Sequence, residues 1–221
     1  MAKSLLSSKQ KQFLQYVSSE SSFNKQFYLS GGTALSEYYL QHRYSEDLDF
    51  FSETEFRPQD ITLLLGSSKS RFGNPILEFE SSFNRNIYQL TYPKKKFLKV
   101  EFTYFPFKPI GNHEKISNIK IDSLIDIAVN KIFTIYQNPR GRDYYDLYCI
   151  LNKEKSINIQ KLVNFAKIKF DTNINYLQLG TNLSKVINYL DDPIVKKAIN
   201  HKHIEDFFLN QAKKMQEKFI K

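Results

Sequence analysis

The sequence predicts an α+β fold, in which a mixed β-sheet flanked by helices is followed by a C-terminal bundle of helices. Two observations lead to this prediction. Short apolar and aromatic runs with partial period-two alternation, which is typical of strands, all lie before Gly111. After Gly111, apolar residues recur at helical spacing towards the C-terminus. At 221 residues the chain is long enough for one sizeable domain, or for a domain with a smaller appendage.

Helix and strand signals alternate at the N-terminus. Near-helical spacing of apolar residues predicts an opening helix within residues 4–19, and a short strand follows at residues 26–30. Gly31 and Gly32 end that strand. A second helix is expected to begin at this turn, with Thr33 as its candidate cap.

The next strand, EDLDFF at residues 46–51, is predicted to have two different faces. Successive side chains of a strand point to opposite sides of a sheet, so Leu48 and Phe50 lie on one face. The other face carries the carboxylates of Asp47 and Asp49. This strand therefore combines an apolar side that can be buried with an acidic side.

Three more strands are expected after a helix that begins at Pro58. They are rich in aromatic and β-branched residues and lie at residues 75–82, 85–92 and 97–105. The run Lys94–Lys96 marks the turn between the last two. Together with the two earlier strands they form the predicted sheet.

The remainder of the chain is predicted to be helical. The helical patterns cover residues 121–136, 141–151, 157–170, 181–190 and about 192–221. We therefore divide the chain into an N-terminal domain, residues 1–150, and a helical C-terminal region, residues 151–221. In the N-terminal domain, residues 24–110 form the core and the helices of residues 122–150 complete the site.

Composition indicates a globular protein of a reducing compartment. The chain is 41% hydrophobic and 25% charged, which is ordinary for such a protein. No apolar run approaches the roughly 18 residues of a membrane span, and the first residues lack a secretory-signal pattern. The one cysteine, Cys149, excludes an internal disulfide framework and is expected in the core. We expect a cytoplasmic protein that does not enter a membrane.

The net charge of +9 is distributed unevenly along the chain. Residues 151–221 contain 13 lysines, no arginine and seven acidic residues. A basic excess of this kind favours polyanionic partners such as nucleic acid, because phosphate contacts release counterions. Lysine-rich composition is also common in proteins from AT-rich genomes, and charge alone does not separate these two interpretations.

Two carboxylates two residues apart on a strand are the first chemical signal. The side chains of Asp47 and Asp49 project from the same face, close enough to share a cation. Their mutual repulsion is removed by a divalent ion, and Mg²⁺ prefers oxygen ligands from one or two carboxylates together with substrate phosphates. The alternative is solvated charge on an exposed strand, which the apolar neighbours Leu48 and Phe50 make less favourable.

The glycine pair supplies the second signal. A Gly-Gly turn between a strand and a helix lets backbone N–H groups approach a phosphate, and the helix N-terminus adds a favourable potential. Ser30, just before Gly31 and Gly32, could add a hydroxyl donor. Alone, such a pair is more often a tight turn. Combined with the carboxylates of the following strand, it predicts a site for a nucleoside triphosphate and magnesium.

These motifs resemble those of a known family. The segments LSGGTAL and HRYSEDLDFF are similar to the signature of the DNA polymerase β-like nucleotidyltransferases and, more narrowly, of the AbiEii/AbiGii toxin family, also called DUF1814. That family continues with a helical lysine and an Arg-Asp pair before Asp-Leu-Tyr, which this chain matches at Lys131, Arg142, Asp143 and Asp146. The resemblance covers about residues 27–150. The spacer between the glycines and the carboxylates is slightly longer than the commonest superfamily spacing.

The resemblance implies roles for the N-terminal residues. Triphosphate oxygens would be bound by the turn residues Ser30, Gly31, Gly32 and Thr33. Magnesium would be held by Asp47 and Asp49. A third carboxylate on a later strand would activate the attacking hydroxyl, and Glu101 is its candidate because Val100 and Phe102 would face the core. The alternative for Glu101 is an ordinary exposed strand glutamate.

The resemblance also implies roles in the helices after residue 122. Lys131 and Arg142 would bind nucleotide phosphates, and Asp143 would be catalytic, with Asp146 structural or supporting. Each has a simpler explanation, because Lys131 could extend to solvent beside an apolar face and both acids could stabilise a helix N-terminus. Arg43 is expected to pair locally or with Asp47.

The function expected from this resemblance is Mg²⁺-dependent nucleotidyl transfer from an NTP to an RNA hydroxyl. The favoured acceptor is the 3′ end of tRNA, and growth arrest by a toxin with a cognate antitoxin is the expected biological result. A protein side chain or a small molecule is the alternative acceptor. The alternative from another class is a catalytically silent module that binds nucleotide or RNA.

Overall fold

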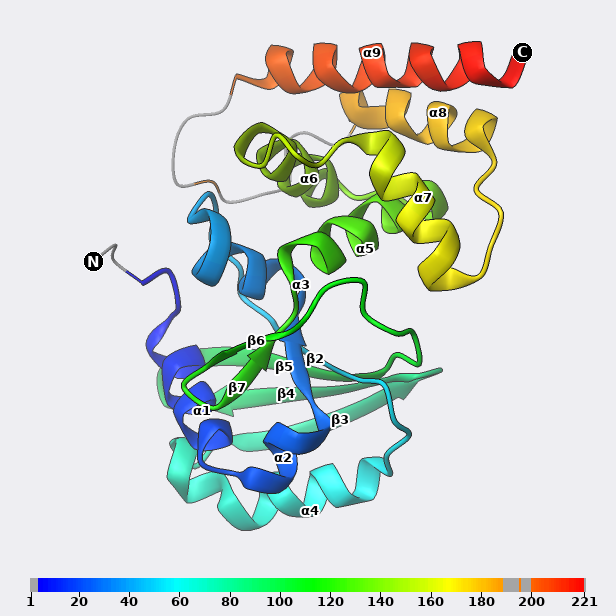
Figure 1. Ribbon diagram of the computed structural model, residues 1–221. Helices are drawn as coiled ribbons and strands as arrows, with labels where there is room; N and C mark the ends of the chain where they lie inside the picture. Colours follow the sequence, from blue (N-terminus) through cyan, green and yellow to red (C-terminus); the bar gives the residue numbers. More distant parts are fainter. Residues whose placement is uncertain (1–3, 189–194, 196–199, 221) are drawn as a thin grey trace. The chain divides into compact units, whose positions relative to one another are not determined.

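The structure is a computed structural model, and it describes residues 4–188, 195 and 200–220. The chain forms two compact units (Figure 1). The first, called here the sheet unit, contains Met1–Tyr39, Ser45–Lys108 and Asn112–Ser123. The second, the helical unit, contains Leu40–Tyr44, Pro109–Gly111 and Leu124–Lys221.

The sheet unit is built on a mixed sheet that has seven strands within the described residues. Their order is β3-β4-β5-β2-β1-β7-β6. Strands β2 and β5 are parallel, as are β1 and β7, and the other neighbours are antiparallel. The strands are β1 Tyr28–Ser30, β2 Leu48–Ser52, β3 Ile76–Ser82, β4 Arg85–Tyr92, β5 Lys96–Tyr104, β6 Glu114–Ile116 and β7 Ile119–Ile121.

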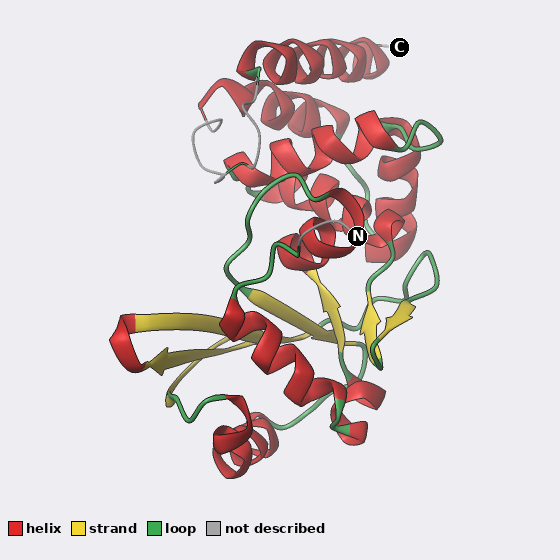
Figure 2. Cartoon of the chain, turned by 90° about the vertical axis from the view of Figure 1, so that its left-hand side faces the viewer, coloured by secondary structure: helices red, strands yellow, loops and turns green. Residues whose placement is uncertain are grey.

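Helices α1, α2 and α4 cover one face of this sheet (Figures 1 and 2). The helical segments of the unit are α1 Ser8–Ser18, α2 Ser21–Gln26, α3 Gly31–Ala34, the π-helix η1 Leu35–Leu40, α4 Pro58–Ser68 and the 3₁₀ turns η2 Lys69–Phe72 and η3 Pro93–Lys95. A capping box explains the start of α1, because Ser7 and Gln10 bond each other's backbone N–H groups. Pro58 starts α4, where its missing N–H costs nothing.

The covered face holds the core of the sheet unit. Phe50 of β2 and Phe102 of β5 are fully buried and stack with ring centroids 5.6 Å apart. Phe13 of α1 and Phe23 of α2 pack against Phe50, with centroids 6.3 and 4.9 Å away. Burial of each such ring stabilises the fold by about 1.5–3 kcal/mol. The opposite face carries the odd-numbered residues of β2 and β5, among them Asp49 and Glu101, so the apolar core fixes which way the acids point.

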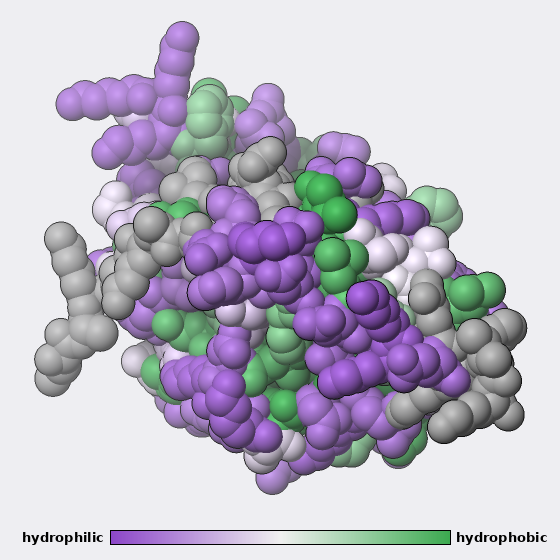
Figure 3. All heavy atoms as spheres, turned by 90° about the horizontal axis from the view of Figure 1, so that it is seen from above, coloured by the Kyte–Doolittle hydropathy of each residue, from purple (hydrophilic) through white to green (hydrophobic). Residues whose placement is uncertain are grey.

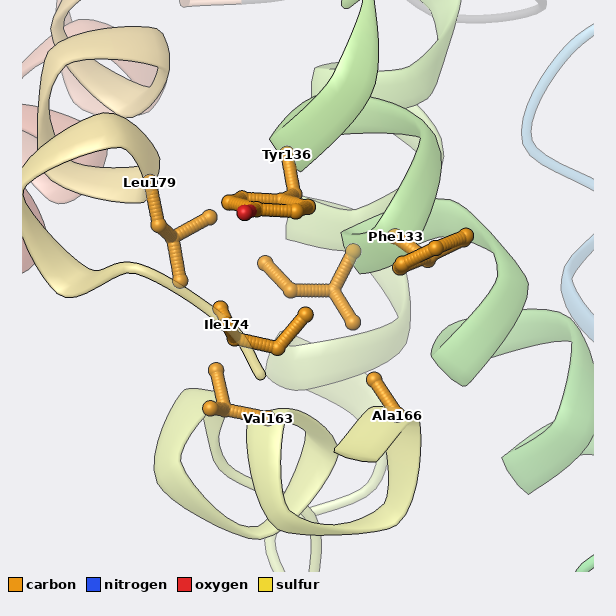
Figure 4. A pocket seen from close by; sticks show the side chains of 7 residues that line it. Phe133, Tyr136, Val163, Ala166, Ile174 and Leu179 are labelled. Carbon is orange, nitrogen blue, oxygen red and sulfur yellow. The ribbon is translucent and has the colours of Figure 1, made fainter. Parts of the chain in front are cut away.

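The helical unit consists of packed helices. They are α5 Leu124–Gln137, α6 Gly141–Lys153, α7 Ile159–Phe170, α8 Tyr176–Ser184, the 3₁₀ turn η4 Lys185–Asn188 and α9 His201–Ile220. Helices α8 and α9 run side by side (Figure 1). Between α5, α7 and α8 lies a small apolar depression lined by Phe133, Tyr136 and Ile174, among others, and it leaves no room for a water molecule (Figure 4). Cys149 is only partly buried, and burial raises the pKa of its thiol to about 12.

No helix in the described part of the chain combines the length and the apolar character needed to cross a membrane. The face drawn in Figure 3 is largely hydrophilic, with hydrophobic residues confined to smaller areas.

The α+β fold with a mixed sheet and C-terminal helices is confirmed. Two local predictions are wrong, and one helix was not expected. Thr33 is not a helix cap, because the helix already begins at Gly31 and Ser30 occupies the N-cap position. Ile121 ends strand β7 rather than starting a helix, since Ile119 and Ile121 are buried in the sheet. Helix α2, within Ser21–Gln26, was not expected.

The helix predicted from about residue 192 is described only from His201, and its earlier part lies outside the described residues. Contacts group α5 and α6 with the later helices, whereas the sequence assigned both to the domain of residues 1–150. Compactness does not decide which helices complete a site, so the division at residue 150 stays a prediction.

Candidate active site

The acidic face of the sheet aligns three of the predicted residues. Asp49 lies opposite Ser30 in the antiparallel pair β1–β2 and opposite Glu101 in the parallel pair β2–β5. Paired residues point to the same side of a sheet, so these three side chains form a row across neighbouring strands. Asp47 precedes β2 by one residue, and both aspartates are partly exposed. The sheet therefore presents three carboxylates on one face.

The glycine turn is shaped to pass close to Asp49. Gly31 has φ +71°, a left-handed conformation that favours glycine, and a Cβ at this position would overlap Asp49 Oδ2. Two further contacts fix the backbone just before β2. Thr33 Oγ1 donates a hydrogen bond to the Asp47 carbonyl, and Gln10 Nε2 donates to the Ser45 carbonyl at 2.8 Å. Side-chain atoms on two helices thus hold the loop that carries Asp47.

Ser30 does not present a free hydroxyl in this structure. Its Oγ donates a 2.6 Å hydrogen bond to Oδ2 of Asp122, a carboxylate that is 1% exposed. Asp122 directly follows β7, and its backbone N–H donates to the Leu29 carbonyl at 2.8 Å. Asp122 was not a predicted site residue because Ile121 and Asp122 were placed at the start of a helix. The alternation of Ile119 and Ile121 was the signal for that strand.

Two basic residues of β4 and β5 pair with the predicted acids. Lys99 Nζ lies 2.7 Å from Asp47 Oδ2. Arg85 donates to both Glu101 oxygens, from Nε and Nη2, at 2.6 Å each, and Thr103 Oγ1 donates to Glu101 at 3.0 Å. Burial raises the pKa of Glu101, but the hydrogen bonds and charge of Arg85 outweigh burial and lower it below its usual value. Glu101 is thus an ionised, buried carboxylate rather than an exposed strand residue.

The donor set on this face fits a magnesium ion. Asp47 and Asp49 offer hard oxygen ligands from one side of the sheet, and the turn at Gly31 brings backbone without a side chain against Asp49. Within the described residues, no group of three or more acidic, histidine or cysteine side chains is arranged to hold a metal ion. Two carboxylates with substrate phosphates are the coordination that magnesium commonly takes.

The helical unit contains a buried ionic network that includes the predicted residues Lys131, Asp143 and Asp146. Asp146 of α6 is 0% exposed. It accepts hydrogen bonds from Arg43 Nε at 2.6 Å and Nη2 at 2.8 Å, and from His42 Nε2 at 2.7 Å. Lys131 Nζ of α5 lies 2.7 Å from the same carboxylate. Of the two pairings expected for Arg43, the local one is present, because Nη1 donates to the Tyr44 carbonyl at 2.9 Å. Its charged partner is the buried Asp146, which accepts two parallel hydrogen bonds, and not Asp47.

Asp143 belongs to the same network. It is 0% exposed and accepts from Lys131 Nζ at 2.8 Å and from Arg140 Nε at 2.8 Å. Burial raises the pKa of both Asp143 and Asp146, but the charge of Lys131 and the neighbouring arginines lower each pKa below its usual value. Arg142 is partly exposed and forms no ion pair with the rest of the described chain. Of the residues of this unit that match the family pattern, Lys131 and Asp143 are therefore held in ion pairs, whereas Arg142 can contact a ligand.

Three of the cations that pair with the predicted acids were not singled out from the sequence. Lys99, Arg85 and Arg140 each contact a predicted acid. Arg140 stands three residues before Asp143, a spacing that could have indicated the pair. The other two pairs depend on strand register, for which the sequence held no signal.

Comparisons with known proteins address the family and the fold. A family model described as "Nucleotidyl transferase AbiEii toxin, Type IV TA system" matches residues 12–218. A protein of Aquifex aeolicus, "Uncharacterized protein aq_aa25", is 27% identical over 201 residues, covering 85% of this chain and 86% of that protein.

Two solved structures from Helicobacter pylori share the fold. JHP933 is 18% identical, with a TM-score of 0.62 over 94% of this chain and 90% of its own. A candidate nucleotidyltransferase is 20% identical, with a TM-score of 0.63 over 96% of this chain and 97% of its own. Because the family model spans nearly the whole sequence, the chain belongs to the AbiEii nucleotidyltransferase toxin family.

Proposed function

We propose that this protein is a Mg²⁺-dependent nucleotidyltransferase that transfers a nucleotidyl group from an NTP to a hydroxyl of RNA, with the 3′ end of tRNA as the favoured acceptor. The observation that carries the proposal is the acidic face. There Asp47 and Asp49 point to one side, Glu101 lies in register with Asp49, and Gly31 packs against the Asp49 carboxylate. Membership of the AbiEii family supports the same chemistry.

In this proposal Asp47 and Asp49 hold the metal ion and the glycine turn holds the triphosphate. The first N–H groups of a helix lack partners within it, so Gly31, Gly32 and Thr33 offer donors to phosphate oxygens. Thr33 contributes only its N–H, because its hydroxyl already bonds the Asp47 carbonyl. When bound, magnesium would polarise the α-phosphate and neutralise charge on the leaving group.

The reaction forms a bond between the acceptor oxygen and the α-phosphorus. The bond from the α-phosphorus to the oxygen that bridges it to the β-phosphate breaks, and pyrophosphate leaves. Glu101 takes the proton of the attacking hydroxyl. Glu101 is ionised and can accept this proton, but the hydrogen bonds from Arg85 that lower its pKa also make it a weaker base, so one of its oxygens must first lose its hydrogen bond from Arg85.

The acceptor and the biological role rest on charge and on the family. The net charge of +9 and the 13 lysines after residue 150 favour a polyanionic acceptor such as tRNA. In the helical unit, Arg142 is the predicted phosphate-binding residue that remains unpaired within the described chain. We further propose that the protein acts as a toxin with a cognate antitoxin, as the description of its family implies.

The test is transfer of radiolabel from each α-labelled NTP to total tRNA in the presence of Mg²⁺, with Asp49→Asn as the matched variant. Label in tRNA with the wild-type protein alone is the expected result, and it also names the nucleotide. Label on protein or on a small molecule instead would overturn the RNA acceptor while keeping the chemistry. NTP binding without any transfer would favour the silent binding module.

A further inference from the structure

Lys99 pairs with a carboxylate that the proposed reaction needs for metal binding. Its Nζ lies 2.7 Å from Asp47 Oδ2, and the two side chains are 35% and 29% exposed. Lys99 also lies two residues before Glu101 on β5, and its charge helps to lower the pKa of that carboxylate. The ammonium of Lys99 therefore pairs with Asp47 and also acts electrostatically on Glu101.

The ion pair of Lys99 is of a kind that exchanges easily. Ion pairs between partly exposed side chains contribute little net stability, because water solvates both partners when they separate. A lysine also has a long flexible stem and three rotatable donors. Lys131 is the opposite case, since it is 7% exposed and bridges the buried Asp143 and Asp146.

Charge balance on the acidic face changes when a divalent ion binds. Without the ion, Asp47 and Asp49 repel each other, and Lys99 supplies a compensating positive charge. With the ion, two positive charges replace that of Lys99, and like-charge repulsion moves the ammonium away. The triphosphate then brings new negative charge to the same face.

We propose that Lys99 exchanges with the metal ion: it pairs with Asp47 when no ion is bound, and it binds the phosphates of the NTP once the ion occupies Asp47 and Asp49. This proposal rests on the proposed function, because it assumes that these two aspartates hold the metal. It assigns the phosphate-binding cation of the sheet unit to Lys99, on β5.

If Lys99 exchanges with the metal ion, replacing it should change the affinity for the metal ion and the affinity for the nucleotide in opposite directions. Replacing Lys99 with methionine removes the competitor of the metal ion, so Mn²⁺ without nucleotide should bind more tightly, by about three- to tenfold. The same variant loses a phosphate contact, so an α,β-methylene NTP analogue at saturating Mn²⁺ should bind about tenfold more weakly or worse. A lysine that only stabilises the fold cannot produce opposite changes.

Calorimetry on the full chain tests this with three lysine variants, and with Asp49→Asn as the variant that removes a proposed metal ligand. Lys99→Met should show the opposite changes, and Lys99→Arg, which keeps the charge, should stay close to wild type for the analogue. Lys96→Met is the matched control, because Lys96 is an exposed lysine of the same strand, and it should alter neither affinity. Thermal melts establish that each variant is folded.

The outcomes separate this inference from the proposed function. If Lys99→Met weakens both affinities or changes neither, the exchange is overturned while the metal site stands. If Lys99→Arg loses as much analogue affinity as Lys99→Met, the charge is not the cause and the exchange is again overturned. If Mn²⁺ binds equally well to wild type and Asp49→Asn, the metal is not on this face and the proposed function fails first.

Discussion

The sheet unit and the helical unit both carry carboxylates that match the family pattern, but they use them differently. On the sheet, Asp47 is 29% exposed at its side chain and pairs with one flexible lysine. In the helical unit, Asp143 and Asp146 are 0% exposed, and each contacts at least two cationic side chains. The first arrangement can exchange its partner for a ligand, whereas the second has its oxygens already occupied.

This difference shows that the burial of a carboxylate and the number of its charged partners indicate whether it binds a ligand or stabilises the fold. The sequence motif that contains the carboxylate indicates this less well. A buried carboxylate with several charged hydrogen bonds is costly to disturb, because any change leaves an unpaired charge in a poorly solvated place. A carboxylate at the edge of solvent has no such constraint. The catalytic role predicted for Asp143 stays a prediction, and the comparison gives ways to test it.

The largest expected effect is a loss of activity when a carboxylate of the sheet unit is replaced. Asp49→Asn should lower nucleotidyl transfer about a thousandfold or more, since it removes a ligand charge worth several kcal/mol in the transition state. Its melting temperature should change little, because Asp49 is partly exposed. Labelled-NTP transfer and a thermal melt on the same preparation measure both quantities. Retained activity would contradict the assignment of the acidic face.

The next largest effect is a loss of stability when a buried carboxylate of the helical unit is replaced. Asp146→Asn should lower the free energy of unfolding by about 3–5 kcal/mol, because Arg43 and Lys131 would lose their buried partner. Urea unfolding followed by circular dichroism measures it. A loss below about 1 kcal/mol would mean that the network is not structural, and the contrast between the units would disappear.

The helical unit should contribute to the pH dependence of stability, in addition to Glu101 of the sheet unit, whose pKa is also lowered. The pKa values of Asp143 and Asp146 are lower in the folded protein than the ordinary value near 4 of an unfolded chain. Their stabilising contribution is therefore complete above about pH 4 and is lost as the pH falls through the folded pKa values. Urea unfolding between neutral pH and about pH 2.5 should show a steeper decline for wild type than for Asp146→Asn. Equal slopes would show that these groups do not carry the acid sensitivity.

The smallest effect concerns the glycine turn. Gly31→Ala places a Cβ at φ +71° against Asp49, so it should cost about 1–2 kcal/mol of stability and roughly tenfold to a hundredfold in activity. Gly66→Ala is the control, because Gly66 lies in α4 with open space around it, and it should be neutral or slightly stabilising. Equal activity in the two variants would show that the close approach of Gly31 to Asp49 is irrelevant.

The sequence was sufficient for the elements whose signals are local. Alternation of apolar and polar residues predicted β2, β4 and β5, and it placed Leu48 and Phe50 on the buried face. The Gly-Gly turn and the Asp-x-Asp spacing predicted the position of the candidate active site. Strand β7, three residues long between a turn and a helix, was too short for its period to stand out.

The partners of the predicted acids could not be found from sequence because they depend on tertiary structure. Arg43 and Asp146 are 103 positions apart, and no local pattern links them. The pairs Lys99–Asp47 and Arg85–Glu101 require the register of β2, β4 and β5, which packing of the apolar face determines. The residues of the acidic face were thus predictable, whereas their electrostatic state was not.

The most direct test of the metal site on the acidic face is a titration of wild type, Asp49→Asn and Asp143→Asn with Mn²⁺. Electron paramagnetic resonance measures the bound Mn²⁺, at a temperature where all three proteins are folded. We expect Asp49→Asn to weaken Mn²⁺ binding about tenfold or more, whereas Asp143→Asn should bind Mn²⁺ as wild type does. Loss of binding in Asp143→Asn with full binding in Asp49→Asn would contradict it, because the metal would then belong to the buried carboxylates of the helical unit.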